Sequence, residues 1–315
     1  MTDQHRYLVI GSGGLQGAAV AEKLGAAGHE VRGFTRGGAP SATTTTVYGD
    51  LADPDGLRRA FEGITHASVV LPLVFDRELV ETYATNIATA ARRAGLRRIV
   101  HNTNLPLPAE VTRYDVYETR RIAERILRDS GVPVVVLRPT VYLDNIFSPW
   151  NGPELVNHGV LSYPFAPDRK VAWLSHEDLA TATVAALTRE GLEHTVLPLT
   201  GGQEVTGPEL AGLLGAELND EVTFRPLTAT GFEAMLRGPL GARTAAGVAG
   251  IYHWLDEHPD SELFRADPTA ERVLGFRPTP IGEWIRTRPW RVWREPQEDG
   301  PAPGGDPGLT RPGTA

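Results

Sequence analysis

A glycine-rich segment that directly follows a short apolar strand is the feature that most constrains this chain. Residues 7–10 are apolar and lead into the run GSGGLQG at 11–17, after which the alanine-rich stretch 18–27 favours a helix. In such a strand–turn–helix, glycines allow a tight turn, the approach of a pyrophosphate to bare backbone, and close packing of the helix on the strand. The N–H groups and positive dipole end of the helix also favour phosphate. The residues predicted to bind a dinucleotide here are Gly11, Ser12, Gly14, Leu15, Gln16 and Gly17.

Composition argues against several classes of function. The chain has 315 residues, a formal net charge of −8 at pH 7 and no cysteine. It therefore lacks a disulfide, a thiol nucleophile and thiolate metal ligands, and its acidity disfavours nucleic-acid binding. No other metal-ligand spacing is present, so we expect no metal. With no signal segment and no apolar run of membrane-spanning length, we expect a cytoplasmic protein without a membrane or nucleic-acid partner.

Up to about residue 139, short apolar runs alternate with helical patterns. Strands are predicted at 7–10, 30–35, 47–49, 67–73, 98–103 and 132–138, and helices at 18–27, 54–62, 76–94 and 114–130. Nearly continuous Val/Ile/Leu strands separated by helices indicate a parallel sheet covered on both faces. Right-handed crossovers make this α/β sheet doubly wound and Rossmann-like, with ligands at the carboxyl ends of its strands.

The pattern changes after residue 140, where Pro, Asn, Gly and aromatic residues lack a clear period up to 167. A strand at 171–174 is expected to return to the sheet, and further strands and helices follow at 176–189, 194–199, 206–214, 222–227, 232–237 and 245–257. We predict a dinucleotide-binding domain over 1–140, to which 171–200 returns. A smaller C-terminal α+β part, made of 141–170 and 201–290, is expected to bind the substrate. The Pro/Gly-rich residues 296–315 are expected to be a disordered tail.

The end of the second predicted strand, Phe34-Thr35-Arg36, carries no carboxylate. A dinucleotide without a 2′-phosphate is usually held at this position by Asp or Glu through its ribose hydroxyls. Arg36 can instead pair with a 2′-phosphate to which Thr35 hydrogen-bonds, which favours NADP(H) over NAD(H). The alternative for Arg36 is an ordinary solvated loop arginine.

Two further strand ends are expected to contact the same cofactor. In Gly49-Asp50-Leu51, Asp50 can accept a hydrogen bond from the adenine amine while Leu51 packs on the ring. Alternatively, Asp50 caps the turn and helix that follow. At the end of the fourth strand, the backbone at Leu71 is expected to run under the ribose of the cofactor.

Several short motifs follow one another along the chain. They are GxxGxxG at 11–17, TR at 35–36, GDL at 49–51, NIATAARRAG at 86–95, AERILRDSGVPVVVLRP at 123–139, YLDN at 142–145, EDLA at 177–180, LTG at 199–201 with EL at 209–210, and FRP at 276–278 with EWI at 283–285. Over residues 5–290 this set resembles the NmrA-like group of atypical short-chain dehydrogenase/reductase proteins. The resemblance implies a Rossmann-like NADP-binding domain and a smaller C-terminal part that closes a substrate cleft.

Related reductases use a Tyr-x-x-x-Lys pair, in which the lysine lowers the pKa of the tyrosine that donates a proton. Here no lysine occurs between residues 24 and 169. The family pattern puts Arg120 at the lysine position and Val116 at that of the tyrosine, whereas a shift of one residue pairs Tyr117 with Arg121. An arginine can bind ribose hydroxyls and favour ionisation of a tyrosine, but it relays no proton at neutral pH. Tyr117 is a candidate proton donor or, alternatively, a buried aromatic residue of an amphipathic helix.

The fifth strand ends in His101-Asn102-Thr103-Asn104. The resemblance places Thr103 and Asn104 at the family's hydroxyl positions. His101 exchanges protons near neutral pH and is a second candidate proton donor, unless the alternation of the strand buries its ring. After the sixth strand, Asn145 resembles a family asparagine near the nicotinamide and the substrate.

Two other groups of residues allow more than one interpretation. An aromatic set is expected either to line an apolar pocket or to pack in the core and a lid: Tyr142, Phe147, Trp150, Tyr163 and Phe165. The run His176-Glu177-Asp178 suggests a metal or a catalytic triad. The resemblance instead makes Asp178 structural, as a cap of the helix that follows.

Together these features predict an NADPH-dependent oxidoreductase that reduces a small carbonyl substrate of aromatic or quinone-like type. The catalytic candidates are Tyr117, His101, Thr103 and Arg120, with solvent as another source of the proton. The missing Tyr/Lys pair also suits an NADP(H)-binding sensor or regulator without turnover. A non-redox isomerase or cyclase on the same fold is a third alternative. The sequence leaves the substrate and the oligomeric state open.

Overall fold

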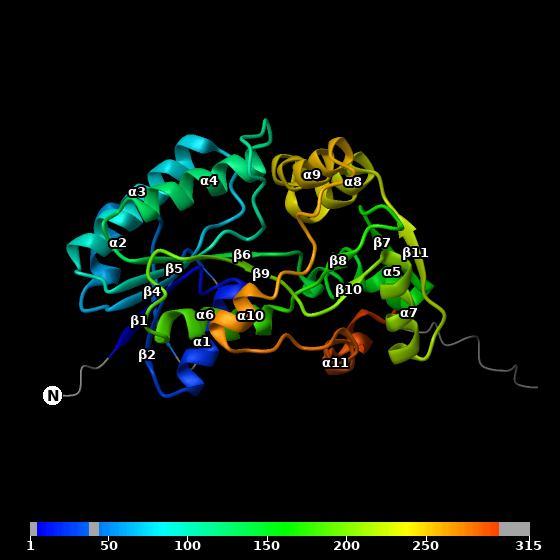
Figure 1. The fold of residues 1–315 in the computed structure, drawn as a ribbon, viewed down its shortest axis with the longest axis horizontal. Coiled ribbons are helices and arrows are strands. Elements are labelled where there is room, and N and C mark those ends of the chain that lie inside the picture. The colour runs from blue at the N-terminus through cyan, green and yellow to red at the C-terminus, as the bar shows by residue number, and fades with distance from the viewer. Residues whose placement is uncertain (1–4, 38–43, 296–315) are drawn as a thin grey trace, which may run out of the picture.

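A seven-stranded parallel sheet forms the centre of the computed structural model, which describes residues 5–37 and 44–295 (Figure 1). Its strands are β1 (Arg6–Ile10), β2 (Glu30–Thr35), β3 (Thr45–Tyr48), β4 (His66–Val70), β5 (Arg98–Asn102), β6 (Val134–Pro139) and β9 (Val196–Leu199). They lie in the order β3-β2-β1-β4-β5-β6-β9. Because the order runs outward from β1 in both directions, the sheet is doubly wound and the predicted α/β fold class is confirmed.

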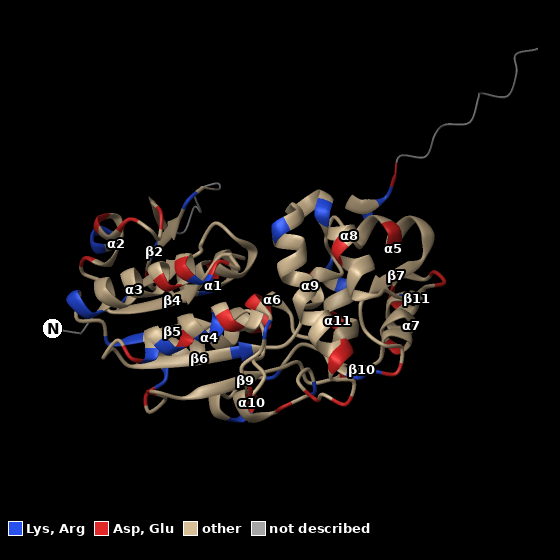
Figure 2. Ribbon diagram, turned by 90° about the horizontal axis from the view of Figure 1, so that it is seen from above, with Lys and Arg blue, Asp and Glu red and all other residues tan. Residues whose placement is uncertain are grey.

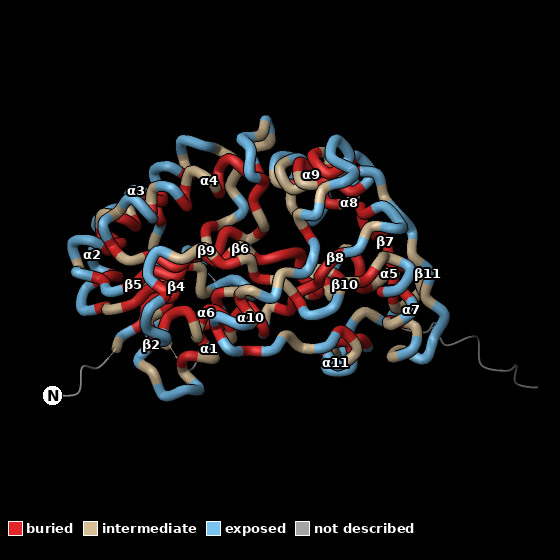
Figure 3. Tube along the Cα trace, viewed as in Figure 1, coloured by how far each residue is buried: buried red, intermediate tan, exposed pale blue. Residues whose placement is uncertain are grey.

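Helices cover both faces of this sheet because its strands are apolar on both sides. In β1, Leu8 and Ile10 belong to the core on one face, and Tyr7 and Val9 to the core on the other. The first face is covered by α2 (Pro54–Phe61), α3 (Arg77–Arg93) and α4 (Asp115–Arg128), and the second by α1 (Leu15–Ala26), α6 (His176–Thr188) and α10 (Thr269–Leu274). Figure 3 shows the buried strands between helices whose outer sides are exposed.

Side-chain caps define where several of these helices begin. Asp53 caps α2, Asp76 caps α3 and Ser175 caps α6, each accepting a hydrogen bond from an N–H group of the first turn. Such a cap satisfies a donor that a helix start leaves unpaired. Helix α1 differs, because its N-cap residue is Gly14, which makes no side-chain cap. No side chain of the cap residue therefore competes for the first N–H groups of α1.

A second, smaller part of the molecule lies beside the sheet and is built mainly from residues after 140 (Figure 1). It contains the parallel pair β7 (Val160–Tyr163) and β11 (Thr223–Pro226) and the antiparallel pair β8 (Val171–Ala172) and β10 (Glu204–Val205). Its helices include α5 (Gly152–His158), α7 (Gly207–Leu218), α8 (Ala229–Leu240), α9 (Ala242–Glu257) and α11 (Ile281–Thr287). One core rich in Tyr, Trp and Phe side chains joins these elements.

One strand expected to return to the central sheet does not do so. The segment predicted at 171–174 contains only the two-residue β8, which pairs with β10. The chain returns to the sheet at β9 instead, in parallel beside β6. The segment 142–167, which has no clear period, contains α5 and β7, and β7 finds its partner β11 much later in the chain. Such distant pairing leaves no local pattern to read.

The surface shows how charge is distributed over the two parts. In the view of Figure 2, acidic and basic residues are interspersed over the helices of both. Within the described ranges, no helix is both long enough and apolar enough to cross a membrane. The predicted tail, 296–315, lies outside the described residues.

Asp178 joins the two parts of the molecule and does not cap a helix. Ser175 is the N-cap of α6, and its hydroxyl accepts from the Asp178 N–H. The Asp178 side chain is buried, and its carboxylate accepts hydrogen bonds from the Thr279 N–H at 3.0 Å and the Thr279 hydroxyl at 2.8 Å. The expected role as a cap is therefore wrong, since the carboxylate holds the segment before α11 against α6.

We expect Asp178→Ala to lower the free energy of unfolding by about 2–4 kcal/mol, because it removes two hydrogen bonds to a charged group and leaves the Thr279 N–H without its acceptor. Chemical denaturation measures the change. The control is Glu177→Ala at the neighbouring position, whose side chain is 69% exposed. It should cost less than about 0.5 kcal/mol. Equal losses in the two variants would contradict the proposed role of Asp178.

Candidate functional site

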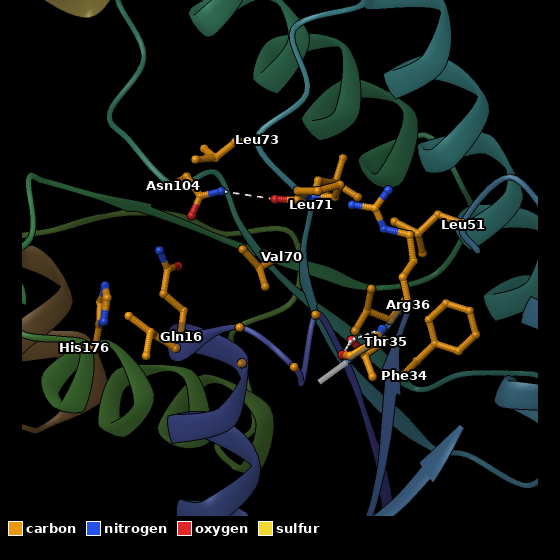
Figure 4. A pocket seen from close by; sticks show the side chains of 18 of the residues that line it. Gln16, Phe34, Thr35, Arg36, Leu51, Val70, Leu71, Leu73, Asn104 and His176 are labelled. Carbon is orange, nitrogen blue, oxygen red and sulfur yellow. Dashed lines mark hydrogen bonds between the residues drawn. The ribbon is translucent and has the colours of Figure 1, made fainter. Parts of the chain in front are cut away.

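A cleft of about 520 Å³ runs along the carboxyl ends of β1, β2 and β4. Most residues predicted to bind a dinucleotide line it: Gly11, Gly14, Leu15, Gln16, Gly17, Thr35, Arg36, Leu51, Leu71, Asn104 and Asn145. Figure 4 shows Thr35 and Arg36 on one side of the glycine loop and Gln16 and His176 on the other. The cleft thus extends from the end of β2 to the start of α6, at the switch point of the sheet where ligands of such folds bind.

The four glycines of the loop have different surroundings. Gly11 has a φ of +85°, a conformation that favours glycine, and allows the tight turn after β1. At Gly17 a β-carbon would lie 2.2 Å from the Gly11 carbonyl oxygen, so only glycine lets α1 pack this closely. At Gly13, which was not among the predicted contacts, it would lie 2.4 Å from Thr35 Oγ1. At Gly14 the nearest atom would be 3.5 Å away, and this residue instead starts α1 without a side-chain cap.

These features fit the pyrophosphate of a dinucleotide. The cleft is bordered by bare glycine backbone and by the start of an α-helix with no side-chain cap. Both provide N–H groups and a positive dipole end for phosphate oxygens. Arg36 adds a cationic side chain at the far end of the cleft, beyond β2. Thr35 holds the turn here, since its hydroxyl donates to the Gly37 carbonyl at 2.6 Å.

Two predicted cofactor contacts, Asp50 and Ser12, are not among the described residues that line the cleft. Asp50 Oδ1 accepts a hydrogen bond from the Ala52 N–H at 2.8 Å, so the structure favours its alternative role in the turn before α2. Ser12 packs against β2, because a β-carbon at Gly33 would lie 2.6 Å from Ser12 Oγ. Its side chain therefore faces the sheet.

A second cavity, of about 190 Å³, adjoins the cleft. Five residues line both: Gln16, Leu73, Asn104, Tyr142 and Asn145. The rest of its wall is mainly apolar and includes Phe75, Leu105, Val116, Val141, Trp150, Tyr163, Phe232, Leu236, Tyr252 and Phe264. Of the aromatic set predicted to line a pocket, Tyr142, Trp150 and Tyr163 do so here. Phe147 instead packs against Trp290 and Trp293, and Phe165 stacks on Tyr163 in the core.

Hydrogen bonds hold the polar side chains at the boundary of the two cavities. Gln16 Oε1 accepts from Asn102 Nδ2 at 2.8 Å, and Asn104 Nδ2 donates to the Leu71 carbonyl at 3.3 Å. Asn104 has a φ of +67°, which directs its side chain from a strained turn after β5. On the other side, Asn145 Nδ2 donates to the hydroxyl of Tyr163 at 3.2 Å. The predicted Asn104 and Asn145 therefore lie together, although they come from different strand ends.

Tyr117 and His101 are buried away from both cavities, so far as the described lining shows. Tyr117 is fully buried, packs edge-on against Trp254, and burial raises the pKa of its hydroxyl. Burial also lowers the pKa of His101 to about 4, while its Nδ1 lies 3.3 Å from the Val69 carbonyl oxygen. Both side chains are neutral at pH 7 and line neither of the two described cavities. The structure therefore argues against the two predicted proton donors.

The other two catalytic candidates, Thr103 and Arg120, lie in different surroundings. The buried hydroxyl of Thr103 donates to the carbonyl of Leu105, at 2.7 Å, and lines neither described cavity, which argues against a catalytic role. Arg120 lines the second cavity but not the cleft. This position argues against the ribose contact implied for it and places its guanidinium beside the apolar cavity instead.

His176 lines the cleft although its sequence context, His176-Glu177-Asp178, suggested only a metal or a triad. It lies at the start of α6, with its ring 4.7 Å from that of Tyr142. Its N–H donates to Asp144 Oδ2 at 2.8 Å, and burial lowers the pKa of its side chain. Among the described residues no group of three or more His, Asp or Glu side chains is arranged to hold a metal ion. In the sequence, the position of His176 directly after Ser175, the N-cap of α6, could have indicated that it lies at the start of this helix and so at the cleft.

The comparison with protein families decides the classification. The model of the NmrA-like family matches residues 3–285. This chain belongs to the NmrA-like family. The resemblance inferred from the motifs is therefore confirmed over nearly its whole extent.

Individual relatives are more distant. An NAD(P)H azoreductase from Xenophilus azovorans is 28% identical over 230 residues, 70% of this chain and 77% of the relative. The NADPH complex of quinone oxidoreductase 2 from Escherichia coli has a TM-score of 0.73 at 23% identity, covering 89% of this chain and 98% of that one. NmrA, a negative transcriptional regulator in complex with NADP, has a TM-score of 0.70 at 19% identity, covering 91% and 95%. These two structures share the fold of this NmrA-like protein.

The burial of His101 predicts a pH-dependent stability. The unfolded side chain takes up a proton near pH 6.5 and the folded one only near pH 4. Between these values the unfolded state binds more protons, so stability falls as the pH is lowered. His101→Gln should remove up to about 3 kcal/mol of the loss between pH 6.5 and 4, as measured by denaturant unfolding at each pH. An unchanged pH slope in this variant would show that His101 titrates normally.

Proposed function

We propose that this protein is an NADPH-dependent oxidoreductase that reduces a small carbonyl substrate of aromatic or quinone-like type. The observation that carries the proposal is the junction of the two cavities. A cleft suited to a dinucleotide meets an apolar, aromatic cavity across five shared residues. Relatives named as an NAD(P)H azoreductase and as a quinone oxidoreductase support the same class of reaction.

In this proposal the cleft binds NADP(H), and each part of the chain has a defined task. The glycine loop from Gly11 to Gly17 holds the pyrophosphate, and Arg36 pairs with the 2′-phosphate. Leu51 packs on the adenine, while the backbone at Leu71 runs beside the ribose. Tyr142 and Asn145 border the nicotinamide end. The reduced cofactor supplies a hydride when it is bound there.

The chain contributes mainly binding and orientation. Residues 1–140 with 171–200 hold the cofactor, and residues 141–170 with 201–290 close the substrate cavity. Its apolar wall holds a flat ring beside the boundary residues. Tyr163 lines this cavity, and burial raises the pKa of its hydroxyl to about 12, so the hydroxyl stays neutral and can donate a hydrogen bond. With Tyr117 and His101 out of reach, solvent supplies the proton.

The role of Arg36 can be tested by cofactor preference. Arg36→Ala should weaken NADPH binding about 10- to 100-fold and leave NADH binding nearly unchanged, because only NADPH carries the 2′-phosphate. Fluorescence titration with both cofactors measures the two affinities. Arg92→Ala, an exposed position on α3, makes the same change in net charge and serves as the control. Equal losses for NADPH and NADH would contradict the assignment.

Turnover is the direct test of the enzymatic proposal. The wild-type protein should oxidise NADPH when quinones, azo dyes or aryl ketones are added, followed by the loss of NADPH absorbance. A binding titration on the same sample establishes that the cofactor site is intact. Tight NADPH binding without oxidation across this panel would overturn the proposal that the protein is an oxidoreductase.

One observation favours a second candidate function, an NADP(H)-binding sensor without turnover. Neither predicted proton donor, Tyr117 or His101, lines a described cavity. NmrA itself, described as a negative transcriptional regulator in complex with NADP, has the same fold. The turnover experiment separates the two candidates, since a sensor binds NADPH tightly and oxidises none.

A further inference from the structure

A buried arginine in the wall of the second cavity has hydrogen-bonding capacity that the protein does not use. Arg120 is 5% exposed and lines this cavity. Its Nη1 donates to the Val74 carbonyl and to Thr119 Oγ1, each at 2.9 Å. Its Nη2 is buried and has no hydrogen-bond partner among the described residues. Buried donors are nearly always paired, so this one calls for an acceptor.

The charge of Arg120 is likewise uncompensated. The two glutamates of α4 pair with other arginines: Glu118 with Arg121, and Glu124 with Arg128 and Arg138. None of the ion pairs within the described ranges includes Arg120. Its guanidinium instead lies over the ring of Phe75, 5.1 Å from the ring centre. Burial lowers its pKa to about 10, which still leaves it charged at neutral pH. A buried cation without a carboxylate is costly, and an anion in the cavity would offset that cost.

Thr140 provides a second observation at the same place. It follows β6, is 1% exposed and lines the same cavity. Its hydroxyl is also buried without a hydrogen-bond partner in the described part of the chain. Two residues that each carry a buried, unpaired donor, one from α4 and one from the end of β6, therefore line the same apolar cavity. An apolar substrate alone would leave both of them unpaired.

We propose that Arg120 Nη2 and Thr140 Oγ1 form a subsite for an anionic oxygen, and that the substrates are aromatic compounds carrying a carboxylate or a phenolate. The apolar wall takes the ring and the two donors take the charged oxygen. The volume of about 190 Å³ suits this, since apolar cavities of about 150 Å³ hold a benzene ring. The inference rests on the proposed function in treating this cavity as the substrate site.

A matched pair of aromatic probes tests the subsite by binding alone. The protein is saturated with NADP⁺ and titrated calorimetrically with benzoate and with benzamide, which have nearly the same shape but differ in charge. Wild-type protein should bind the carboxylate about 10- to 100-fold more tightly, the range expected for a hydrogen bond to a charged group. Equal affinities for the two probes in wild-type protein would overturn the proposal without any variant.

Variants then assign the preference to Arg120. Arg120→Gln should bind both probes about equally, and Arg120→Lys should keep part of the preference because it keeps the charge. Arg125→Gln, an exposed position on the same helix that lines neither cavity, loses the same charge and should behave as wild type. If Arg120→Gln retained the full preference, or if Arg125→Gln lost it equally, the subsite would be wrong. If Arg120→Gln does not fold, Arg120→Lys decides, and a full loss of the preference contradicts a role for the charge.

The outcomes also separate this inference from the proposed function. Arg120 does not line the cleft, so NADP⁺ should bind its variants as it binds the wild type. Loss of NADP⁺ binding in both Arg120 variants would contradict the subsite, because it would place the arginine in the cofactor site. A protein that prefers the carboxylate but oxidises no NADPH would retain the subsite and lose the oxidoreductase. A protein that oxidises NADPH without preferring the carboxylate would retain the enzyme and lose the subsite.

Discussion

The close approach of helix α1 to the glycine loop is the constraint on which the site depends. A β-carbon at Gly17 would lie 2.2 Å from the Gly11 carbonyl oxygen, which is far inside van der Waals contact. This approach lets the helix start directly at the end of β1, at the switch point of the sheet. The N-terminal N–H groups of α1 then face the cleft rather than a capping side chain. The proposed phosphate site thus depends on Gly17, because a side chain there would prevent this close approach.

The sheet and the cofactor loop could be predicted because their signals are local. Apolar runs and glycine spacing reflect contacts between residues that are close in the chain or in neighbouring strands, such as Gly11 and Gly17. The pairing of β8 with β10 could not be predicted in this way. Two-residue strands carry no period, and β8 also donates a hydrogen bond, from the Ala172 N–H, to the carbonyl of Phe264 far along the chain.

The two candidate proton donors show a second reason why the site could not be predicted fully from the sequence. Tyr117 and His101 have suitable chemistry at suitable places in the sequence, yet each is buried by distant elements. Trp254 of α9 packs against the ring of Tyr117, and the Val69 carbonyl of β4 lies at His101. Whether a titratable side chain faces a cavity or the core depends on such contacts, which a single sequence does not show. Arg120 shows the opposite outcome. Its position in the family pattern implied a contact with the ribose of the cofactor, whereas in the structure it lines the second cavity.

The cleft and the second cavity are lined largely by different segments of the chain, and this difference affects specificity. The cleft is formed largely by the loop after β1 and by the ends of β2 and β4, whose backbone geometry suits any ligand with the same pyrophosphate. The second cavity is closed by Phe232 of α8, Tyr252 of α9 and Phe264, which come from late in the chain. Changes in these helices can alter the shape of the cavity while the glycine loop and the sheet stay as they are. Arg120 and Thr140 belong to the sheet side of that cavity, at α4 and after β6. In the proposed subsite, the charged oxygen is therefore recognised from the sheet side, and the helices that cover the cavity limit the size of the ring.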